Sequence, residues 1–184
     1  MLCLVILIVT QTLAAMKMAV LNKLLEQRAY TDTHTGLPNK DACEVLLNNK
    51  ETVAEHTACM MFDLNNLKII NDTKGHSKGD QLISNFARLL RNVIPQKDFV
   101  GRYGGDEFMV VIYNTIKTEI EDILKQLSRE KDRLNSSGNN MPIDYACGWA
   151  ISDAYSECTI QMLLDKADYY MYENKQAYKK SKKS

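Results

Sequence analysis

The sequence predicts an α/β sandwich of the α+β kind, in which helices cover one antiparallel sheet. Short apolar runs of strand length alternate with longer amphipathic segments, the order expected when helices pack on a sheet. A Gly-Gly turn joins two of the apolar runs directly, so we expect this pair of strands to be antiparallel. The chain has 184 residues, of which 45% are hydrophobic, and this is enough for one domain with a proper core.

The bulk composition argues against two classes of function. Lys plus Arg and Asp plus Glu each number 23, so the net charge is zero and no nucleic-acid partner is expected. The five cysteines are odd in number and show no C-x-x-C spacing. This pattern indicates reduced thiols, and not a disulfide framework or a zinc site. We therefore expect a domain that works in the cytosol.

The first 29 residues differ from the rest. The stretch MLCLVILIVTQTLAAM has no charge over 16 residues, and Lys17 alone interrupts the run up to Asn22. A spanning helix needs roughly 20 apolar residues, which this run reaches if Lys17 snorkels to the interface. The positive charges that follow it place residues 30–184 in the cytoplasm. We predict a membrane or signalling helix over 1–29. A buried or partner-packed helix is the alternative, and a secretory signal is disfavoured because no basic residue precedes the run.

The other elements follow from periodicity and turn residues. Gly36 and Pro38 mark a turn, and Asn39 can cap the helix after it. An unbroken apolar run predicts a buried strand over 56–63 that ends at Asp63. Further along we expect a short helix with a glycine-bearing loop (65–80), a helix (81–94), two strands (98–103 and 107–113), a helix (117–134), a loop (136–140), a strand (142–152) and a last helix (159–178).

Two of these helices have a clear apolar face. In the helix over 81–94 the inward side chains are expected to be Leu82, Ile83, Phe86, Leu89, Leu90 and Val93. In the last helix they are expected to be Met162, Leu163, Ala167, Tyr170 and Met171. The order of helices, strands and one hairpin suits a ferredoxin-like or polymerase-palm arrangement, with one antiparallel sheet surrounded by helices.

Three carboxylates are candidates for a metal site. A two-residue Gly-Gly turn would place Asp106 and Glu107 at the edge of the sheet, and Asp63 ends the first strand. If these strands are neighbours, the three charges repel one another unless a cation holds them. Hard oxygen ligands suit Mg²⁺, and two such ions can activate a hydroxyl and stabilise a leaving phosphate. A solvated acidic turn is the alternative, and the residues alone leave both open.

The segment after Asp63 suggests a nucleotide site. There a strand gives way to a helix N-terminus, whose free N–H groups suit a phosphate, and Lys68 either adds charge or faces water. Asn71 and Asp80 match the edge of guanine, since a carboxylate accepts from N1–H and N2–H while an amide suits the remaining groups. Helix capping is the alternative for both residues.

Four motifs follow one another between about residues 31 and 180. They are DTHTGLPNK, FDLNNLKIINDTKGHSKGD, RYGGDEF and ADYYMYENKQAYK. Together, in this order, they resemble the GGDEF domain of diguanylate cyclases. The resemblance implies that two GTP condense to cyclic di-GMP with release of two pyrophosphates. Because each 3′-hydroxyl attacks the α-phosphate of the other nucleotide, it also implies a homodimer.

The resemblance assigns roles to the candidate residues. Asp63 and Asp106 would bind metal, with help from the Leu64 carbonyl, and Glu107 would assist either the metals or deprotonation of the 3′-hydroxyl. Mg²⁺ is the expected ion, with Mn²⁺ as an alternative. Asn71 would read guanine together with Asp80. The phosphates would be held by backbone groups around Asn66 and Leu67 and by Lys175 and Lys179, and Lys68 is a further candidate by its position after Asp63. The implied location is the bacterial cell membrane, with the catalytic domain in the cytoplasm.

The chain also departs from the family pattern. His34 stands where Leu is usual, Leu67 where Phe is usual, and Lys179 where Arg is usual. Many members carry an R-x-x-D inhibitory site before the hairpin, but the corresponding residues here are 95–98, which read PQKD. Because proline offers no guanidinium, we expect no conventional product inhibition through this site.

Two other hypotheses remain beside an active cyclase. One is a catalytically silent module that binds GTP or a protein partner. The other is a relative that accepts ATP, which Asp80 disfavours because adenine lacks the paired N1–H and N2–H donors.

Overall fold

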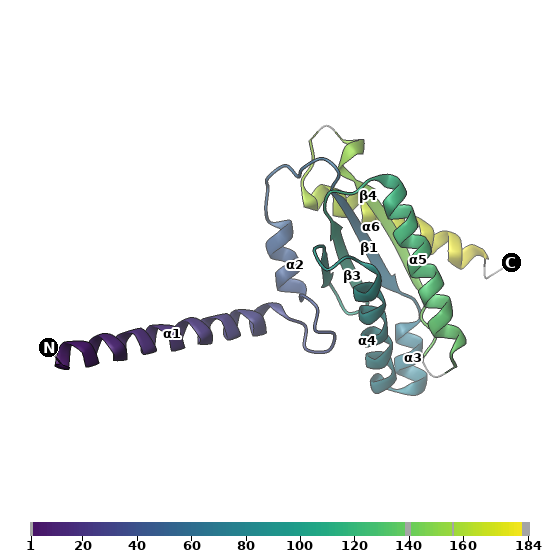
Figure 1. Ribbon diagram of the computed structural model, residues 1–184. Helices are drawn as coiled ribbons and strands as arrows, with labels where there is room; N and C mark the ends of the chain where they lie inside the picture. Colours follow the sequence, from purple (N-terminus) through teal and green to yellow (C-terminus); the bar gives the residue numbers. More distant parts are fainter. Residues whose placement is uncertain (1, 139–140, 156, 182–184) are drawn as a thin grey trace.

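The computed structural model describes residues 2–138, 141–155 and 157–181 and contains a four-stranded sheet with helices on both faces (Figure 1). The strands are β1 (Ala58–Leu64), β2 (Phe99–Arg102), β3 (Glu107–Ile112) and β4 (Tyr145–Ile151). The α-helices are α1 (Leu2–Tyr30), α2 (Lys40–Leu47), α3 (Leu67–Lys74), α4 (His76–Val93), α5 (Lys117–Ser136) and α6 (Ile160–Ser181). The strand order is β2-β3-β1-β4 and every pairing is antiparallel. The predicted fold class is confirmed.

β1 lies in the interior of the sheet and separates two apolar cores. Met60 and Phe62 face the core beneath α4 and α5, whereas Cys59 and Met61 face the core beneath α2 and α6. Because both faces are covered, the strand is buried along its whole length. Such a strand reads as a continuous apolar run, which is why it was predictable from the sequence.

The amphipathic face predicted for residues 81–94 is confirmed, and all its members are buried in α4. The start of this helix is a correction, because α4 begins at His76 and includes Gly79 and Asp80, which we had placed in a loop. The break between α3 and α4 falls at Gly75, whose φ of 86° is a conformation that side chains disfavour. Only this one glycine of the segment therefore acts as a helix breaker.

The inward face predicted for α6 needs a partial correction. Leu163, Ala167 and Met171 are buried, but Met162 and Tyr170 are 49% and 46% exposed. The buried residues Leu163, Ala167 and Met171 follow a spacing of four, and Met162 and Tyr170 lie beside this stripe. The helix approaches β4 closely along it, since a Cβ added to Gly148 would lie 2.2 Å from the Ala167 carbonyl oxygen.

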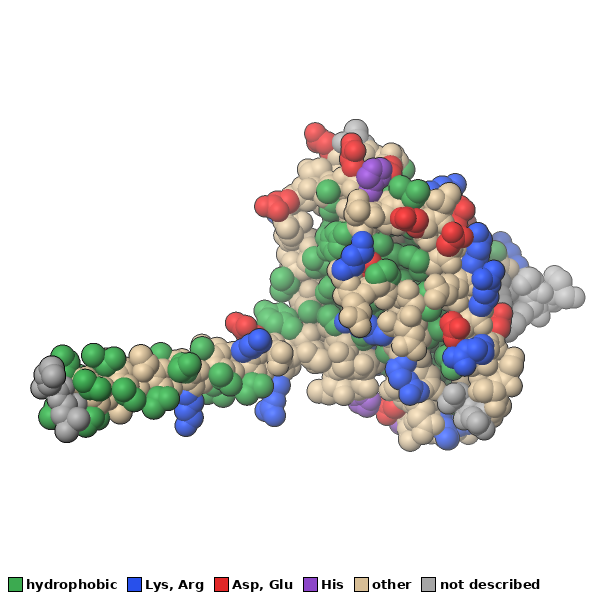
Figure 2. All heavy atoms as spheres, in the orientation of Figure 1, with side chains coloured by type: hydrophobic (Ala, Val, Ile, Leu, Met, Phe, Trp, Pro, Cys, Tyr) green, Lys and Arg blue, Asp and Glu red, His purple; other side chains and the backbone are tan. Residues whose placement is uncertain are grey.

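α1 confirms the helix predicted at the N-terminus and extends away from the sheet and its covering helices (Figure 1). Hydrophobic side chains cover its visible side (Figure 2). The stretch Cys3–Tyr30 is long and apolar enough to cross a membrane by length and composition. Its C-terminal end is fixed to the rest of the domain, because Asn39 donates from its backbone to the Tyr30 carbonyl at 3.0 Å and from its side chain to the Ala29 carbonyl at 2.7 Å. The place of α1 in a membrane stays a prediction.

Candidate active site

The β1–β3 ladder brings the three predicted acids together. Asp63 lies directly opposite Glu107, and the Leu64 N–H donates to the Asp106 carbonyl at 2.9 Å, which continues the ladder by one residue. Side chains alternate along a strand, so Asp63 shares the face of Met61 and points toward α6. The sequence showed the acids but not this register, which depends on strands that are far apart in the chain.

The hairpin differs from the two-residue turn that we expected. The N–H groups of Tyr103 and Gly104 both donate to the Glu107 carbonyl, at 2.9 and 3.2 Å, so the closing turn is longer. Neither glycine has a positive φ. An added Cβ on Gly104 would lie 2.6 Å from Glu107 Oε2 and would make this carboxylate shift, whereas a Cβ on Gly105 would meet nothing within 4 Å. The first glycine therefore makes room for the carboxylate.

Negative charge is in excess around Glu107. Burial raises the pKa of Glu107, and the charges of Asp106, Asp63 and Asp168 raise it further, with Lys175 as the opposing charge. Lys175 reaches from α6 and places Nζ 2.6 Å from Asp63 Oδ1, a charge contact without hydrogen-bond geometry. The sequence motifs indicate no role for Asp168. The signal was its spacing from Lys175, because residues seven apart lie on one face of a helix.

The donor chemistry fits Mg²⁺, although no site is assembled in advance. Within the described ranges, no three His, Cys, Asp or Glu side chains surround a common metal position. Asp63 nevertheless offers a buried oxygen that makes no hydrogen bond. The negative charges of Asp106, Asp63 and Asp168 also raise the pKa of Glu107. A divalent cation such as Mg²⁺ binds oxygen ligands of this kind and would neutralise their excess negative charge. Holding an ion here would require Lys175 to move off Asp63.

The predicted phosphate residues flank the start of α3. Asn66 adopts a left-handed conformation with φ of 64°, which turns the chain from β1 into the helix at Leu67. Its side chain makes no cap hydrogen bond, so the first N–H groups of α3 are not capped by it. Lys68 is exposed on this helix. The Lys179 side chain lies outside the described residues.

The predicted guanine residues lie on adjacent helices, Asn71 on α3 and Asp80 on α4. A Cβ added to Gly79 would lie 1.9 Å from Asn71 Oδ1, so the amide packs against α4 next to Asp80. This Oδ1 is buried without a hydrogen-bond partner. The capping alternative is wrong, because the cap positions of these helices are Asn66, Gly75 and Ile94.

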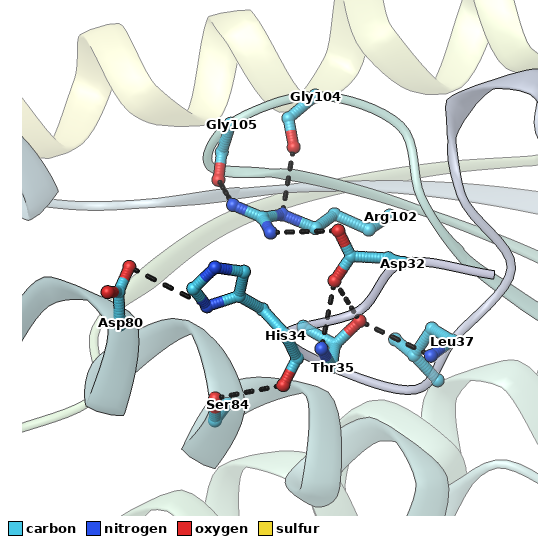
Figure 3. A network of polar contacts seen from close by, with 9 residues as sticks. All are labelled: Asp32, His34, Thr35, Leu37, Asp80, Ser84, Arg102, Gly104 and Gly105. Atoms are coloured by element: carbon cyan, nitrogen blue, oxygen red, sulfur yellow. Dashed lines mark hydrogen bonds and ion pairs between the residues drawn. The ribbon is translucent and has the colours of Figure 1, made fainter.

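Arg102 ties the hairpin to the turn between α1 and α2 (Figure 3). Its Nε donates to the Gly104 carbonyl at 3.2 Å and its Nη2 to the Gly105 carbonyl at 2.8 Å, while Nη1 lies 3.1 Å from Asp32 Oδ2. Asp32 Oδ1 accepts from the N–H and the hydroxyl of Thr35 at 2.9 and 2.7 Å. Burial by itself would raise the pKa of Asp32, but the hydrogen bonds from Thr35 and the charge of Arg102 lower it. The motifs of the sequence contain both residues but indicate no role for either.

The family described as "Diguanylate cyclase, GGDEF domain" matches residues 29–181. The chain belongs to this family. The Escherichia coli protein named diguanylate cyclase DgcP is 33% identical to this GGDEF domain over 113 residues, which cover 59% of the chain and 33% of that protein. The Shewanella oneidensis protein named cyclic di-GMP phosphodiesterase PdeB is 31% identical over 147 residues, which cover 78% of this chain and 17% of that protein.

Solved GGDEF structures support the fold. The coiled coil and GGDEF domain of DgcB from Caulobacter crescentus, crystallised with c-di-GMP, superposes with a TM-score of 0.72. The alignment covers 92% of this chain and 93% of that chain at 20% identity. The chain spans only 17% to 33% of the length of the curated relatives it matches, so the same kind of domain occurs within longer proteins.

Proposed function

We propose that this chain is a diguanylate cyclase that condenses two GTP into cyclic di-GMP and releases two pyrophosphates. The observation that carries the proposal is that Asp63 lies opposite Glu107 in the β1–β3 ladder, next to Asp106. Lys175 contacts Asp63 from α6. Family membership and relatives named as diguanylate cyclases support it. The domain would act in cyclic di-GMP signalling at the cytoplasmic side of a bacterial membrane, held there by α1.

Two of the acids would bind the metal ion, and the third would accept a proton. Asp63, Asp106 and the Leu64 carbonyl would hold Mg²⁺, or Mn²⁺ in its place, and the ion would neutralise phosphate charge and polarise the attacking hydroxyl. Glu107 has a raised pKa and is suited to accept the proton of the 3′-hydroxyl. The 3′-oxygen then bonds to the α-phosphorus as the bond to pyrophosphate breaks. Whether Glu107 also binds metal stays a prediction.

The remaining residues would bind GTP. The start of α3, at Asn66 and Leu67, would offer N–H groups to the phosphates, and Lys68, Lys175 and Lys179 would add charge. Asp80 would accept from N1–H and N2–H of guanine, and Asn71 would complete the contact with the base. Each protomer would bind one GTP. Turnover would need two protomers face to face, because each hydroxyl attacks the nucleotide held by the other.

The direct test is product formation by the full chain in detergent micelles, incubated with GTP and Mg²⁺ and analysed by chromatography. We expect cyclic di-GMP and pyrophosphate. In the D106A variant we expect turnover to fall by at least about a hundredfold, since a metal ligand supplies several kcal/mol of charge stabilisation. A dimeric preparation that makes no cyclic di-GMP would rule out the proposal.

A silent GTP-binding or protein-interaction module is the second candidate. The contact between Lys175 and Asp63 favours it, because the lysine occupies a carboxylate that a metal would need. GTP binding without turnover, unchanged by added Mg²⁺, would support this reading. A mixed product from GTP and ATP would instead favour a cyclase with relaxed base recognition.

A further inference from the structure

His34 lies beside Asp80 on the face of α4 that carries this predicted guanine residue. Its Nδ1 is 3.9 Å from Asp80 Oδ1, and the two side chains point toward one another (Figure 3). One helical turn further along α4, the Ser84 hydroxyl donates to the His34 backbone carbonyl at 3.4 Å. Two contacts on one face of the helix therefore fix residue 34 at the edge of Asp80.

The backbone that carries His34 is held firmly. Asp32 accepts two hydrogen bonds from Thr35 and pairs with Arg102, and Leu37 is buried at 1% exposure. The imidazole therefore projects from a turn that is tied to the hairpin on one side and to α4 on the other. Such a side chain is suited to position a ligand, because its supporting backbone is already ordered.

The ring also has a proton to donate. A separation of 3.9 Å is too long for a hydrogen bond, so Asp80 does not consume the donor capacity of Nδ1. Imidazole carries an N–H in its neutral and its charged form alike, and Nδ1 is the ring nitrogen that lies 3.9 Å from Asp80 Oδ1. The side chains of His34 and Asp80 are 53% and 49% exposed, which leaves room for a base to approach both.

We propose that His34 Nδ1 donates a hydrogen bond to O6 of guanine and so helps to select GTP. The inference rests on the proposed function, in which Asp80 accepts from N1–H and N2–H of the same base. O6 is adjacent to N1–H on the base edge and needs a donor beside the carboxylate, which His34 supplies. Asn71 Oδ1 is a buried acceptor and cannot donate to O6, so from Asn71 only the Nδ2 donors could compete with His34 for this contact. Leucine, the usual residue of the resembling motif, offers no donor.

This reading predicts which atoms of the base matter to which residue. Replacing O6 by sulfur, as in 6-thioguanine, should weaken the contact with His34 because sulfur accepts hydrogen bonds poorly. Removing the 2-amino group, as in hypoxanthine, should instead weaken the contact with Asp80. Adenine carries an amino group at position 6, so its donor would meet the donor of His34.

The experiment measures binding of 3′-deoxy triphosphates of guanosine, 6-thioguanosine and inosine by calorimetry, with the full chain in detergent. These nucleotides lack the attacking hydroxyl, so no turnover occurs. In H34L we expect the affinity for the guanosine form to fall by about fivefold, the size of one hydrogen bond, and that for the 6-thio form by less than about twofold. The guanosine-to-inosine preference should stay unchanged.

Two further variants serve as controls. D80N should reduce the guanosine-to-inosine preference, and H76L should alter neither ratio, since it makes the same substitution at an exposed histidine one turn before Asp80. Equal losses for all three nucleotides in H34L, or no loss, would overturn the inference. If the wild type binds the nucleotides but makes no cyclic di-GMP from GTP, only the cyclase proposal fails. If it binds none of them, both fail together.

Discussion

At the scale of single residues, the candidate site carries more negative than positive charge. The charges of Asp106, Asp63 and Asp168 raise the pKa of Glu107, and Lys175 is the opposing charge. In the absence of a metal this arrangement costs stability, because like charges in one site repel. An enzyme that binds a cation during turnover tolerates such a cost, since the ion removes it.

We therefore expect E107Q to stabilise the metal-free chain. A raised pKa in the folded state means that the stability contributed by protonated Glu107 is complete below its ordinary pKa of 4.5 and is lost as the pH rises through the raised value. Near neutral pH the variant should be more stable than the wild type, by at most about 1 kcal/mol because the site is partly solvated. Thermal unfolding in EDTA measures this difference.

The pH dependence tests the cause of that gain. The difference between E107Q and the wild type should shrink as the pH falls toward 4.5. Added Mg²⁺ should stabilise the wild type more than the variant. The exposed acid Glu157 offers a control, and E157Q should leave the unfolding temperature unchanged. A difference that persists unchanged at acidic pH would contradict the electrostatic explanation.

The pKa of Asp32 is shifted in the direction opposite to that of Glu107. Its folded pKa is lowered, so its contribution to stability is present above the ordinary pKa of 3.8 and is lost as the pH falls through the lowered value. D32N removes the charge and turns one acceptor into a donor that faces Arg102 or Thr35. Near neutral pH we expect a loss of about 1–2 kcal/mol, which urea unfolding measures, with the gap closing in acid. An equal loss at all pH values would show that the charge is not responsible.

At the scale of elements, the hairpin depends on the space that Gly104 leaves for Glu107. G104A would force Glu107 Oε2 away from its position, since the added Cβ would lie 2.6 Å from it. We expect turnover of GTP to fall while the fold, followed by circular dichroism, is kept. The matched variant G105A adds the same methyl group where nothing lies within 4 Å, and it should stay close to wild-type activity. Equal activity of the two variants would remove steric space as the reason for Gly104.

Element types and the antiparallel pairing of β2 with β3 were predictable from the sequence, but the other strand pairings were not. The continuous apolar run of β1 and the periodic apolar face of α4 can be recognised in the local sequence, because burial of each requires its own pattern of apolar residues. The opposition of Asp63 and Glu107 depends on the register of two strands joined by a long connection. Gly79 was misplaced in a loop because glycine disfavours a helix interior, whereas here the space it leaves is occupied by Asn71 from another helix.

The α6 side of the site was the least predictable part. Lys175 was expected to bind phosphate, yet its Nζ lies against Asp63, and no local pattern encodes a contact between residues so distant in the chain. Met162 and Tyr170 were placed inward by a broad helical stripe, but only a narrow stripe at a spacing of four is buried. Both differences concern the packing of the helix on the sheet, which the sequence does not state.

At the scale of the whole molecule, continuous contacts connect α1 to the hairpin. Asn39 binds the last carbonyls of α1, and a bridge between Thr31 and Pro38 closes the turn after it. The Arg102 N–H donates to the Pro38 carbonyl at 2.8 Å, and the Arg102 side chain pairs with Asp32. The end of α1 is therefore joined to the hairpin by an unbroken series of hydrogen bonds and one ion pair between neighbouring residues.

The position of α1 relative to a membrane leads to the last prediction. Cys3–Tyr30 is apolar, long enough to span a bilayer and not buried against the rest of the chain. I8D places a carboxylate within this stretch, at a cost of about 2.5–3.5 kcal/mol for a spanning helix. We expect flotation of the chain with lipid vesicles to fall by at least about tenfold. V45D, which changes an exposed apolar residue of α2, is the matched control and should float like the wild type. Undiminished flotation of I8D would show that α1 does not enter the lipid, and a protein partner would then be the better explanation for its apolar surface.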